Sequence, residues 1–126
     1  MKIRRTLGAV VAGIATLLAL QGVHAHHGWS GQGNEQFELS GTLHSAVSFG
    51  GPHATMQVED DQGRVWDITL APPSRTARSG LEEDTIPVGA KVTVSGHRNG
   101  SSNRLEIKTE RVTWNGTNYD VYPNRL

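Results

Sequence analysis

The chain has 126 residues, with 12 basic and 12 acidic side chains and no cysteine. This length is enough for one small domain, and the lack of cysteine excludes disulfide bonds, a lipid anchor on cysteine and thiolate metal ligands. The balanced charge argues against a nucleic-acid-binding protein, which normally carries a basic face.

Residues 1–25 have the pattern of a cleaved secretory signal. A basic start precedes an apolar run, Leu7–Leu20, that is shorter than the roughly 20 residues needed to span a bilayer. The small residues Val23 and Ala25 form a typical cleavage site, so we expect the mature chain to begin at His26. The product is then periplasmic or secreted, without a stable membrane anchor. An uncleaved interfacial anchor is the alternative, and it leaves no free amine at His26.

The start of the mature chain is rich in small polar residues, which predicts a loosely held N-terminal arm over residues 26–36. From Phe37 to Phe49 apolar side chains alternate with polar ones, which is the period of a long, half-buried strand. Gly41 is a candidate bulge at which this strand bends. Residues 37–126 are therefore predicted to form the folded domain.

Further strands are predicted by the same alternation, each bounded by turn-forming residues. They cover residues 54–59, 64–70, 91–96 and 104–114, followed by a terminal ribbon at 117–122. A short helix from Ser74 to about Arg78 follows the third strand, after two prolines that end the strand. The segments 60–63 and 115–116 favour tight hairpin turns, the second of type I′.

The predicted elements come in the order of a small OB-like Greek-key barrel. They are three strands, a short helix, two more strands and a terminal ribbon. We therefore predict an all-β domain of this type, with its one short helix between strands three and four. A small antiparallel sandwich is the alternative arrangement.

Several motifs resemble those of an uncharacterised family, or domain of unknown function, of small exported bacterial proteins. Its members begin the mature chain with a histidine pair and carry Asn-Pro-His after the first strand, then Ala-Pro-Pro-Ser-Arg and Arg-x-Gly-Leu. The matching segments here are His26-His27-Gly28-Trp29, Gly51-Pro52-His53, Ala71-Pro72-Pro73-Ser74-Arg75, Arg78-Ser79-Gly80-Leu81, Val88-Gly89-Ala90-Lys91-Val92 and Gly96-His97-Arg98. Gly51 replaces the asparagine of the second motif. The resemblance implies export and a compact β fold, and it names no reaction.

The expected mature terminus offers a candidate metal site. The α-amine and imidazole of His26 can chelate one ion, and the imidazole of His53 can add a third nitrogen. This T-shaped set resembles the histidine brace of periplasmic copper carriers and copper monooxygenases. Nitrogen ligands suit copper(II), which the Irving–Williams order favours over other divalent first-row metals. We therefore predict binding of copper(II), or a similar divalent ion, for carriage, sensing or buffering.

Two further histidines are weaker candidates for this metal site. His27 can chelate through its ring and the amide before it. His44, on the polar face of the first strand, neighbours His53 if strands one and two pair antiparallel. His97 is expected to be solvated in a polar loop beside Arg98. Histidines near an exposed terminus also bind metal incidentally, so this motif alone does not establish a physiological site.

A second hypothesis is an exported OB-type binding module that uses no metal and binds a small ligand or a protein partner. Domains of this type bind ligands across strands two and three. Trp66 falls on an apolar face and is expected in the core, while Arg75 and Arg78 are expected on a solvated helix face. Catalysis is not predicted, because no serine lies in a nucleophile motif. A copper oxidoreductase is the enzymatic alternative.

Overall fold

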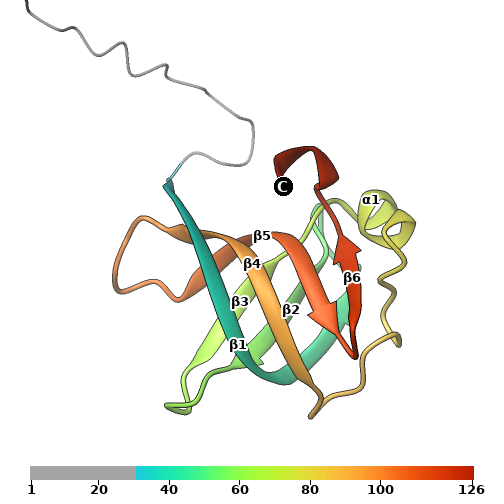
Figure 1. Cartoon of the computed structure of the whole chain (residues 1–126), viewed down its shortest axis with the longest axis horizontal. Coiled ribbons are helices and arrows are strands. Elements are labelled where there is room, and N and C mark those ends of the chain that lie inside the picture. The colour runs from blue at the N-terminus through green and yellow to red at the C-terminus, as the bar shows by residue number, and fades with distance from the viewer. Residues whose placement is uncertain (1–30) are drawn as a thin grey trace, which may run out of the picture.

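A computed structural model of the protein describes residues 31–126 (Figure 1). Its elements are β1 (Gln32–Ser48), β2 (Thr55–Glu59), β3 (Val65–Thr69), α1 (Pro73–Arg78), β4 (Lys91–Asn99), β5 (Glu106–Trp114), β6 (Thr117–Asp120) and the 3₁₀-helix η1 (Pro123–Arg125). The predicted all-β character and the short helix between the third and fourth strands are confirmed. The predicted signal at 1–25, His26 and His27 lie outside the described residues. Within residues 31–126, no helix is both long and apolar enough to cross a membrane.

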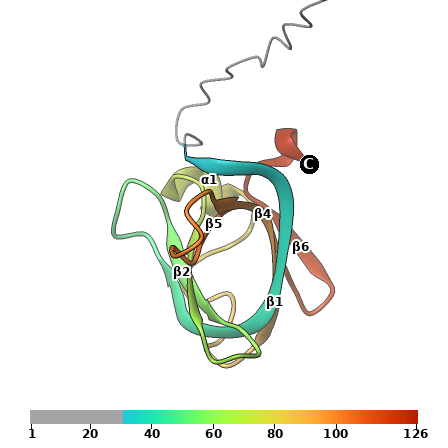
Figure 2. The same cartoon turned by 90° about the vertical axis from the view of Figure 1, so that its left-hand side faces the viewer.

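The strands of the described residues belong to one sheet, in the order β3-β2-β1-β4-β5-β6. Neighbours along this order are antiparallel. β3 also pairs in parallel with β5, through residues 67–69 and 106–108, so the pairings of five strands form a closed cycle. Figures 1 and 2 show the long, curved β1 wrapping around this arrangement, with β6 on the outer side of β5.

The core consists of the apolar side chains that the alternation predicts to point inward. Ala54, Met56 and Val58 are buried at β2, as predicted, and Trp66 of β3 is only 2% exposed. Other buried core side chains are Leu43, Ile68, Leu70, Leu81, Val94, Ile107 and Val112. Each large aliphatic side chain buried in this way contributes about 1.5–3 kcal/mol to stability.

β1 begins at Gln32, five residues before the predicted start at Phe37. Residues 32–36, predicted as part of an arm, therefore belong to the strand. The reason is tertiary: Gln32 pairs with Asn99 and Gln36 pairs with His97 across β4. Small polar residues have a low strand propensity, and pairing with β4 stabilises the strand here despite it.

Gly41 is not a bulge, which corrects the prediction. The register between β1 and β2 is irregular after Leu43, where His44 is the additional residue. At Gly41 the backbones of β1 and β2 approach closely, and a Cβ atom there would collide with the carbonyl of Glu59 and lie 2.8 Å from Val58 Cγ1. Glycine is needed at this position because the space beside it is filled by backbone.

β4 extends through His97 to Asn99, whereas the sequence predicts a loop from His97 onward. Its polar end is held on both sides, by pairing with β1 and with β5. Arg98 also packs its guanidinium over the rings of Trp66, at 4.8 Å, and Phe37, at 5.8 Å. Such cation–π contacts stabilise a polar strand end that composition alone assigns to a loop.

The hairpin predictions are confirmed by the backbone. Gly63 has a φ of 76°, and Asn115 and Gly116 have φ values of 51° and 76°. Two consecutive positive φ angles are the requirement of a type I′ turn, which explains the Asn-Gly pair between β5 and β6.

We expect Gly41→Ala to lower the free energy of unfolding by about 1–3 kcal/mol, because the added methyl group overpacks the contact between β1 and β2. Gly50→Ala is the matched control, since its new Cβ meets nothing closer than 3.4 Å. Denaturant unfolding of both variants measures the difference. Equal stability of the two variants would contradict the close approach.

Candidate functional site

His53 lies in the 49–54 segment between β1 and β2, half-buried at the end of the sheet where β3 leads into α1. The neighbouring Ala54 donates its backbone N–H to the carbonyl of Ala71. Burial first, and then the positive charge of Lys108, lower the pKa of His53. Its imidazole is therefore held in the neutral form, which is the form that binds metal ions.

His44 lies on β1, exposed, with Nδ1 3.6 Å from Glu59 Oε2. β1 and β2 do pair antiparallel, but the register puts Ser48, four residues after His44, beside Thr55. At about 3.3 Å per strand residue, roughly 13 Å of strand separates His44 from the end at which His53 lies. The structure therefore does not bring these two predicted ligands together.

Residues 31–126 contain no group of three or more His, Asp or Glu side chains arranged to hold a metal ion by themselves. His26 and His27 lie outside these residues. Any metal site of the predicted kind therefore needs ligands from the segment before Gly31.

His97 is a functional candidate that the sequence prediction missed. Its side chain is only 16% exposed, and its Nδ1 lies 2.8 Å from the carbonyl oxygen of Gly33. Its Nε2 lies 3.1 Å from Glu110 Oε1 on β5. The expected solvated loop histidine is instead a nearly buried residue that joins the start of β1 to β5.

Glu110 is the most unusual side chain of the described residues. It is completely buried, and neither carboxylate oxygen accepts a hydrogen bond from residues 31–126. Its Oε1 lies 3.1 Å from His97 Nε2, and the two groups form an ion pair when the imidazole is protonated. A buried carboxylate without hydrogen bonds is costly, so its retention needs a specific cation or proton close by.

A β-bulge brings Glu110 to this position. Ser95 pairs with Arg111 and Gly96 pairs with Thr109, so Glu110 is the additional residue on β5. A Cβ at Gly96 would collide with the carbonyl of Lys108, so only glycine permits this approach. Bulges commonly redirect a side chain beside a functional site, and here the bulge lies next to His97 in the chain.

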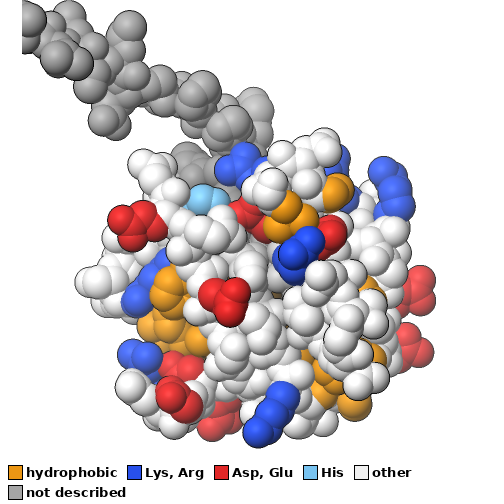
Figure 3. Space-filling model, viewed as in Figure 1, with side chains coloured by type: hydrophobic (Ala, Val, Ile, Leu, Met, Phe, Trp, Pro, Cys, Tyr) orange, Lys and Arg blue, Asp and Glu red, His pale blue; other side chains and the backbone are white. Residues whose placement is uncertain are grey.

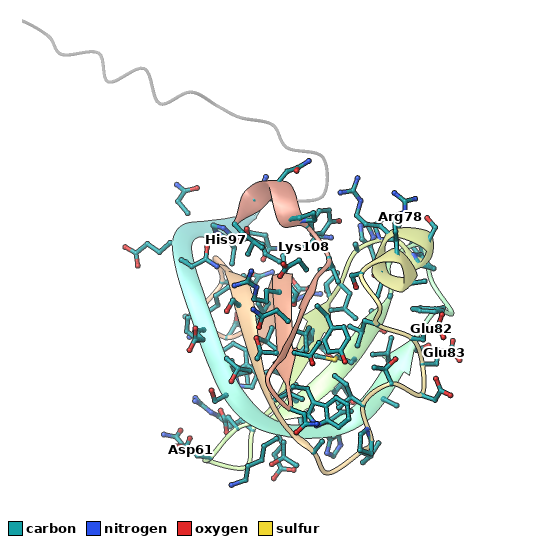
Figure 4. All side chains as sticks on the ribbon, turned by 45° about the vertical axis from the view of Figure 1, so that its right-hand side comes forward. Asp61, Arg78, Glu82, Glu83, His97 and Lys108 are labelled. Atoms are coloured by element: carbon teal, nitrogen blue, oxygen red, sulfur yellow. The ribbon has the colours of Figure 1, made fainter. Side chains whose placement is uncertain are left out.

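The C-terminal segment covers this part of β5. Val121 and Tyr122 both donate their backbone N–H groups to the carbonyl of Glu110. The Tyr122 ring lies 5.6 Å from Lys108 Nζ and 5.3 Å from the guanidinium of Arg75. Figure 4 shows His97 and Lys108 together beneath η1, whereas Asp61 lies at the opposite end of the domain.

Lys108 is 3% exposed, and its Nζ lies 3.5 Å from the carbonyl of Leu70. Burial lowers the pKa of Lys108, because the low-dielectric surroundings disfavour its charge. Lys108 faces His97 across the β4–β5 pairing and acts electrostatically on His53. Lys108 therefore lies close to both His97 and His53, which are 44 residues apart in the chain.

The described chain begins at this same end of the domain. Gly100 donates its backbone N–H to the carbonyl of Gly31, at 2.8 Å, and Gln32 Nε2 reaches Glu106 Oε1 at 3.4 Å. With the contact from His97 to Gly33, these bonds fix the start of β1 beside β4 and β5. The described chain thus begins next to the His97–Glu110 pair.

Only one sequence signal pointed toward this site. His97 is part of the Gly96-His97-Arg98 motif that carries the family resemblance, but the polar residues after it favoured a loop. Glu110 lies in a mixed polar run on β5, where alternation predicts no burial. The bulge that buries it depends on pairing with β4, which the residues of β5 alone do not encode.

The described surface also has hollows away from this site. A groove of about 400 Å³ crosses β1, β2 and β3 and is lined mainly by polar side chains, including Gln57, Asp67, Arg104 and Glu106. On the face shown in Figure 3, acidic and basic side chains are interspersed without a region of one sign. Arg75 and Arg78 are exposed, as predicted, and Arg75 also packs its guanidinium on the Tyr122 ring.

Another hollow, of about 540 Å³, includes Asp60 in its lining. This carboxylate serves the fold. It accepts hydrogen bonds from the indole N–H of Trp66, the side chain of Arg64 and the backbone N–H groups of Gln62 and Arg64, at 2.8–2.9 Å. The Trp66 bond, followed by those of Arg64 and Gln62, holds the pKa of Asp60 well below its usual range.

These features define a small β protein with a polar, partly buried end beside its first strand. The chain belongs to the DUF6152 family, a family of unknown function whose model matches residues 15–108, which confirms the predicted resemblance to an uncharacterised family. No curated protein matches the chain significantly.

Among solved structures, the chain is similar to the crystal structure of the ZRD-deleted mutant of TiaS in complex with agmatine. The TM-score is 0.51 at 14% sequence identity, over 69% of this chain and 26% of that chain. The chain thus spans about a quarter of the structure it matches. At this identity the similarity concerns the fold alone.

We expect Asp60→Asn to lower the thermal unfolding midpoint at pH 7, because the amide cannot accept the same set of charge-assisted bonds. The native pKa of Asp60 is depressed, so its contribution to stability is present above the unfolded pKa of about 3.9 and is lost as pH falls further. Unfolding midpoints measured between pH 7 and pH 2 test this. The unfolding midpoint of the variant should fall less between pH 7 and pH 2 than that of the native protein. The same pH dependence in both proteins would contradict this role of Asp60.

Proposed function

We propose that the protein is exported and binds copper(II), or a similar divalent ion, for carriage, sensing or buffering. His26, as the mature N-terminal residue, supplies its α-amine and its imidazole. His53 supplies the opposing imidazole, and His27 has a lesser part. The protein acts as a binding protein and not as an enzyme.

The observation that carries this proposal is the location of the start of β1. Gly31 and Gly33 are bonded at the end of the domain that holds His97 and Lys108, and Lys108 acts on His53. Gly31 comes five positions after His26, a span of at most roughly 18 Å when extended. That reach supports a metal site shared between the mature terminus and this end of the domain.

The chemistry of the ligands supports the choice of metal. The lowered pKa of His53 keeps its imidazole neutral and ready to coordinate. An α-amine has an ordinary pKa of about 7.7–8.0 and must lose its proton to bind, so metal affinity falls as pH decreases. Amine and imidazole nitrogens in a near-planar set favour copper(II) over the other divalent first-row ions.

We further propose that the domain is an OB-like Greek-key barrel. The pairings that run from β1 through β2, β3, β5 and β4 back to β1 support this proposal, as does α1 between β3 and β4. The polar groove across β1–β3 favours one rival function, an exported OB-type module that binds a small ligand without metal.

Adding one glycine before His26 in the mature protein tests the terminal chelate. The copper(II) affinity should fall at least roughly hundredfold, because the displaced amine no longer closes a ring with the His26 imidazole. Isothermal titration at pH 7.5 measures the change. Adding one glycine after Leu126 is the matched control and should leave the affinity unchanged. An equal affinity in both extended proteins would support the metal-free module instead.

The His53→Ala variant tests whether the folded domain takes part. We expect its copper(II) affinity to fall at least roughly tenfold, since one of the imidazole ligands is removed. Thr55→Ala, an exposed change on the neighbouring strand, is the control for general effects on this segment. An unchanged affinity for His53→Ala would mean that binding rests on the terminal segment without this histidine.

A further inference from the structure

The groove of about 540 Å³ lies across the ends of four strands. β1 forms its middle, where Thr42 pairs with Glu59 of β2 on one side and with Lys91 of β4 on the other. The turn after β2, with Asp61, lines one side, and the end of β5 lines the other. Figure 4 shows Asp61 at the end of the domain opposite η1. The volume is within the range of about 300–1,000 Å³ of small-molecule sites.

Trp114 gives this groove an accessible indole. Its ring is partly buried and packs against the core, and it lines the groove. Its indole N–H donates no hydrogen bond within residues 31–126, and the nitrogen is not buried. Trp66, in contrast, is 2% exposed and donates its indole N–H to Asp60. Trp114 therefore offers a ligand both an apolar ring and a hydrogen-bond donor.

A row of hydroxyl groups crosses the groove. Ser40, Thr93 and Thr113 are in register on β1, β4 and β5. The hydroxyl oxygens of Ser40 and Thr93 lie 3.0 Å apart, and Thr113 donates to the side-chain oxygen of Asn118 at 2.8 Å. Each hydroxyl can donate and accept hydrogen bonds. Two strand spacings give the row a length of roughly 10 Å, which is comparable with a disaccharide.

The charged side chains of the groove have both signs. The carboxylates of Glu59 and Asp61 can only accept hydrogen bonds, and the ammonium group of Lys91 can only donate them. Glu59 also lies 3.6 Å from His44 Nδ1. Two exposed carboxylates oppose a phosphate or a nucleic acid, which need a basic surface. The groove therefore favours an uncharged ligand that has many donors and acceptors.

The strands beneath the groove do not suit an extended peptide. Such a peptide binds by adding a strand at a free edge. β1 is paired with both β2 and β4 at Thr42, and β4 is paired with both β1 and β5 at Thr93. Backbone N–H and C=O groups at these positions are therefore used within the sheet, and recognition falls to the side chains.

We infer that this groove binds a neutral oligosaccharide. The hydroxyls of the sugar bond to Asp61, Lys91 and the row that includes Thr93, and the C–H face of one sugar ring lies on the Trp114 indole. A sugar hydroxyl both donates and accepts, which matches this mixture of groups. The site contains neither His26 nor His53 and needs no metal, so it is independent of the proposed copper(II) site.

Nuclear magnetic resonance of the unmodified ¹⁵N-labelled protein tests the inference without any risk to folding. Cellotetraose, maltotetraose and chitotetraose are each added to millimolar concentration. At least one should shift the indole N–H signal of Trp114, which the Trp114→Phe variant assigns, and leave that of the buried Trp66 in place. If none of the three sugars shifts the Trp114 signal, the inference is wrong.

Two charged probes distinguish a sugar site from an ion site. Spermidine tests whether Glu59 and Asp61 bind a cation, and inorganic phosphate tests whether Lys91 binds an anion. We expect neither probe to shift the Trp114 indole signal as a bound tetrasaccharide does. A shift with spermidine or phosphate and with no tetrasaccharide would overturn the inference in favour of a charged ligand.

The Asp61→Asn variant locates the binding site. Asp61 is exposed on a turn, and the substitution keeps the size of the side chain while it removes the charge. The affinity for the tetrasaccharide that binds best should fall at least roughly fivefold, because a charged acceptor is lost. Asp84→Asn makes the same change at an exposed position outside the groove and is the matched control. Equal affinities in the two variants would mean that the sugar binds elsewhere.

Discussion

The parallel pairing of β3 with β5 is the constraint on which the arrangement of this protein depends. It completes the cycle of five strands and sets Lys108 beside Thr69, close to the turn that leads to α1. The other edge of β5 pairs with β4 and carries the bulge at Glu110. β5 therefore lies between the end of β3, near His53, and the part of β4 that carries His97. β4 in turn pairs with the start of β1.

Two buried carboxylates show how the same group can serve the fold or remain available for chemistry. Asp60 accepts bonds from Trp66, Arg64 and two backbone N–H groups, so its negative charge is fully compensated. Glu110 is at least as buried, yet none of the described residues donates a hydrogen bond to it. Its close polar contact is with His97 Nε2, at 3.1 Å, which compensates the charge when the imidazole is protonated. The contrast shows that the environment, and not burial alone, sets what a buried carboxylate does.

Local sequence patterns predict the strands and turns of this protein well and its site poorly. Alternation identifies the inward faces at Met56 and Trp66, and the Asn115–Gly116 pair identifies its turn, because these signals act over a few residues. The early start of β1, the extension of β4 and the burial of Glu110 all depend on strands distant in the chain. A sequence motif identified His53 as a candidate. Its separation from His44 depends on the pairing register of β1 and β2, which is irregular after Leu43 and could not be read from the sequence.

The same topology has a consequence for how the chain reaches its native state. Most strand contacts join segments far apart in sequence, such as β1 with β4 and β3 with β5, and contacts of this kind slow folding because long loops must close first. β5 follows the other four strands of the cycle in the chain, and it pairs with β6 and bonds to Val121 and Tyr122 beyond it. A nascent chain that lacks this strand leaves the edges of β3 and β4 open. The sheet therefore cannot be completed until β5 has been synthesised, and until then those edges are exposed to pairing with other chains.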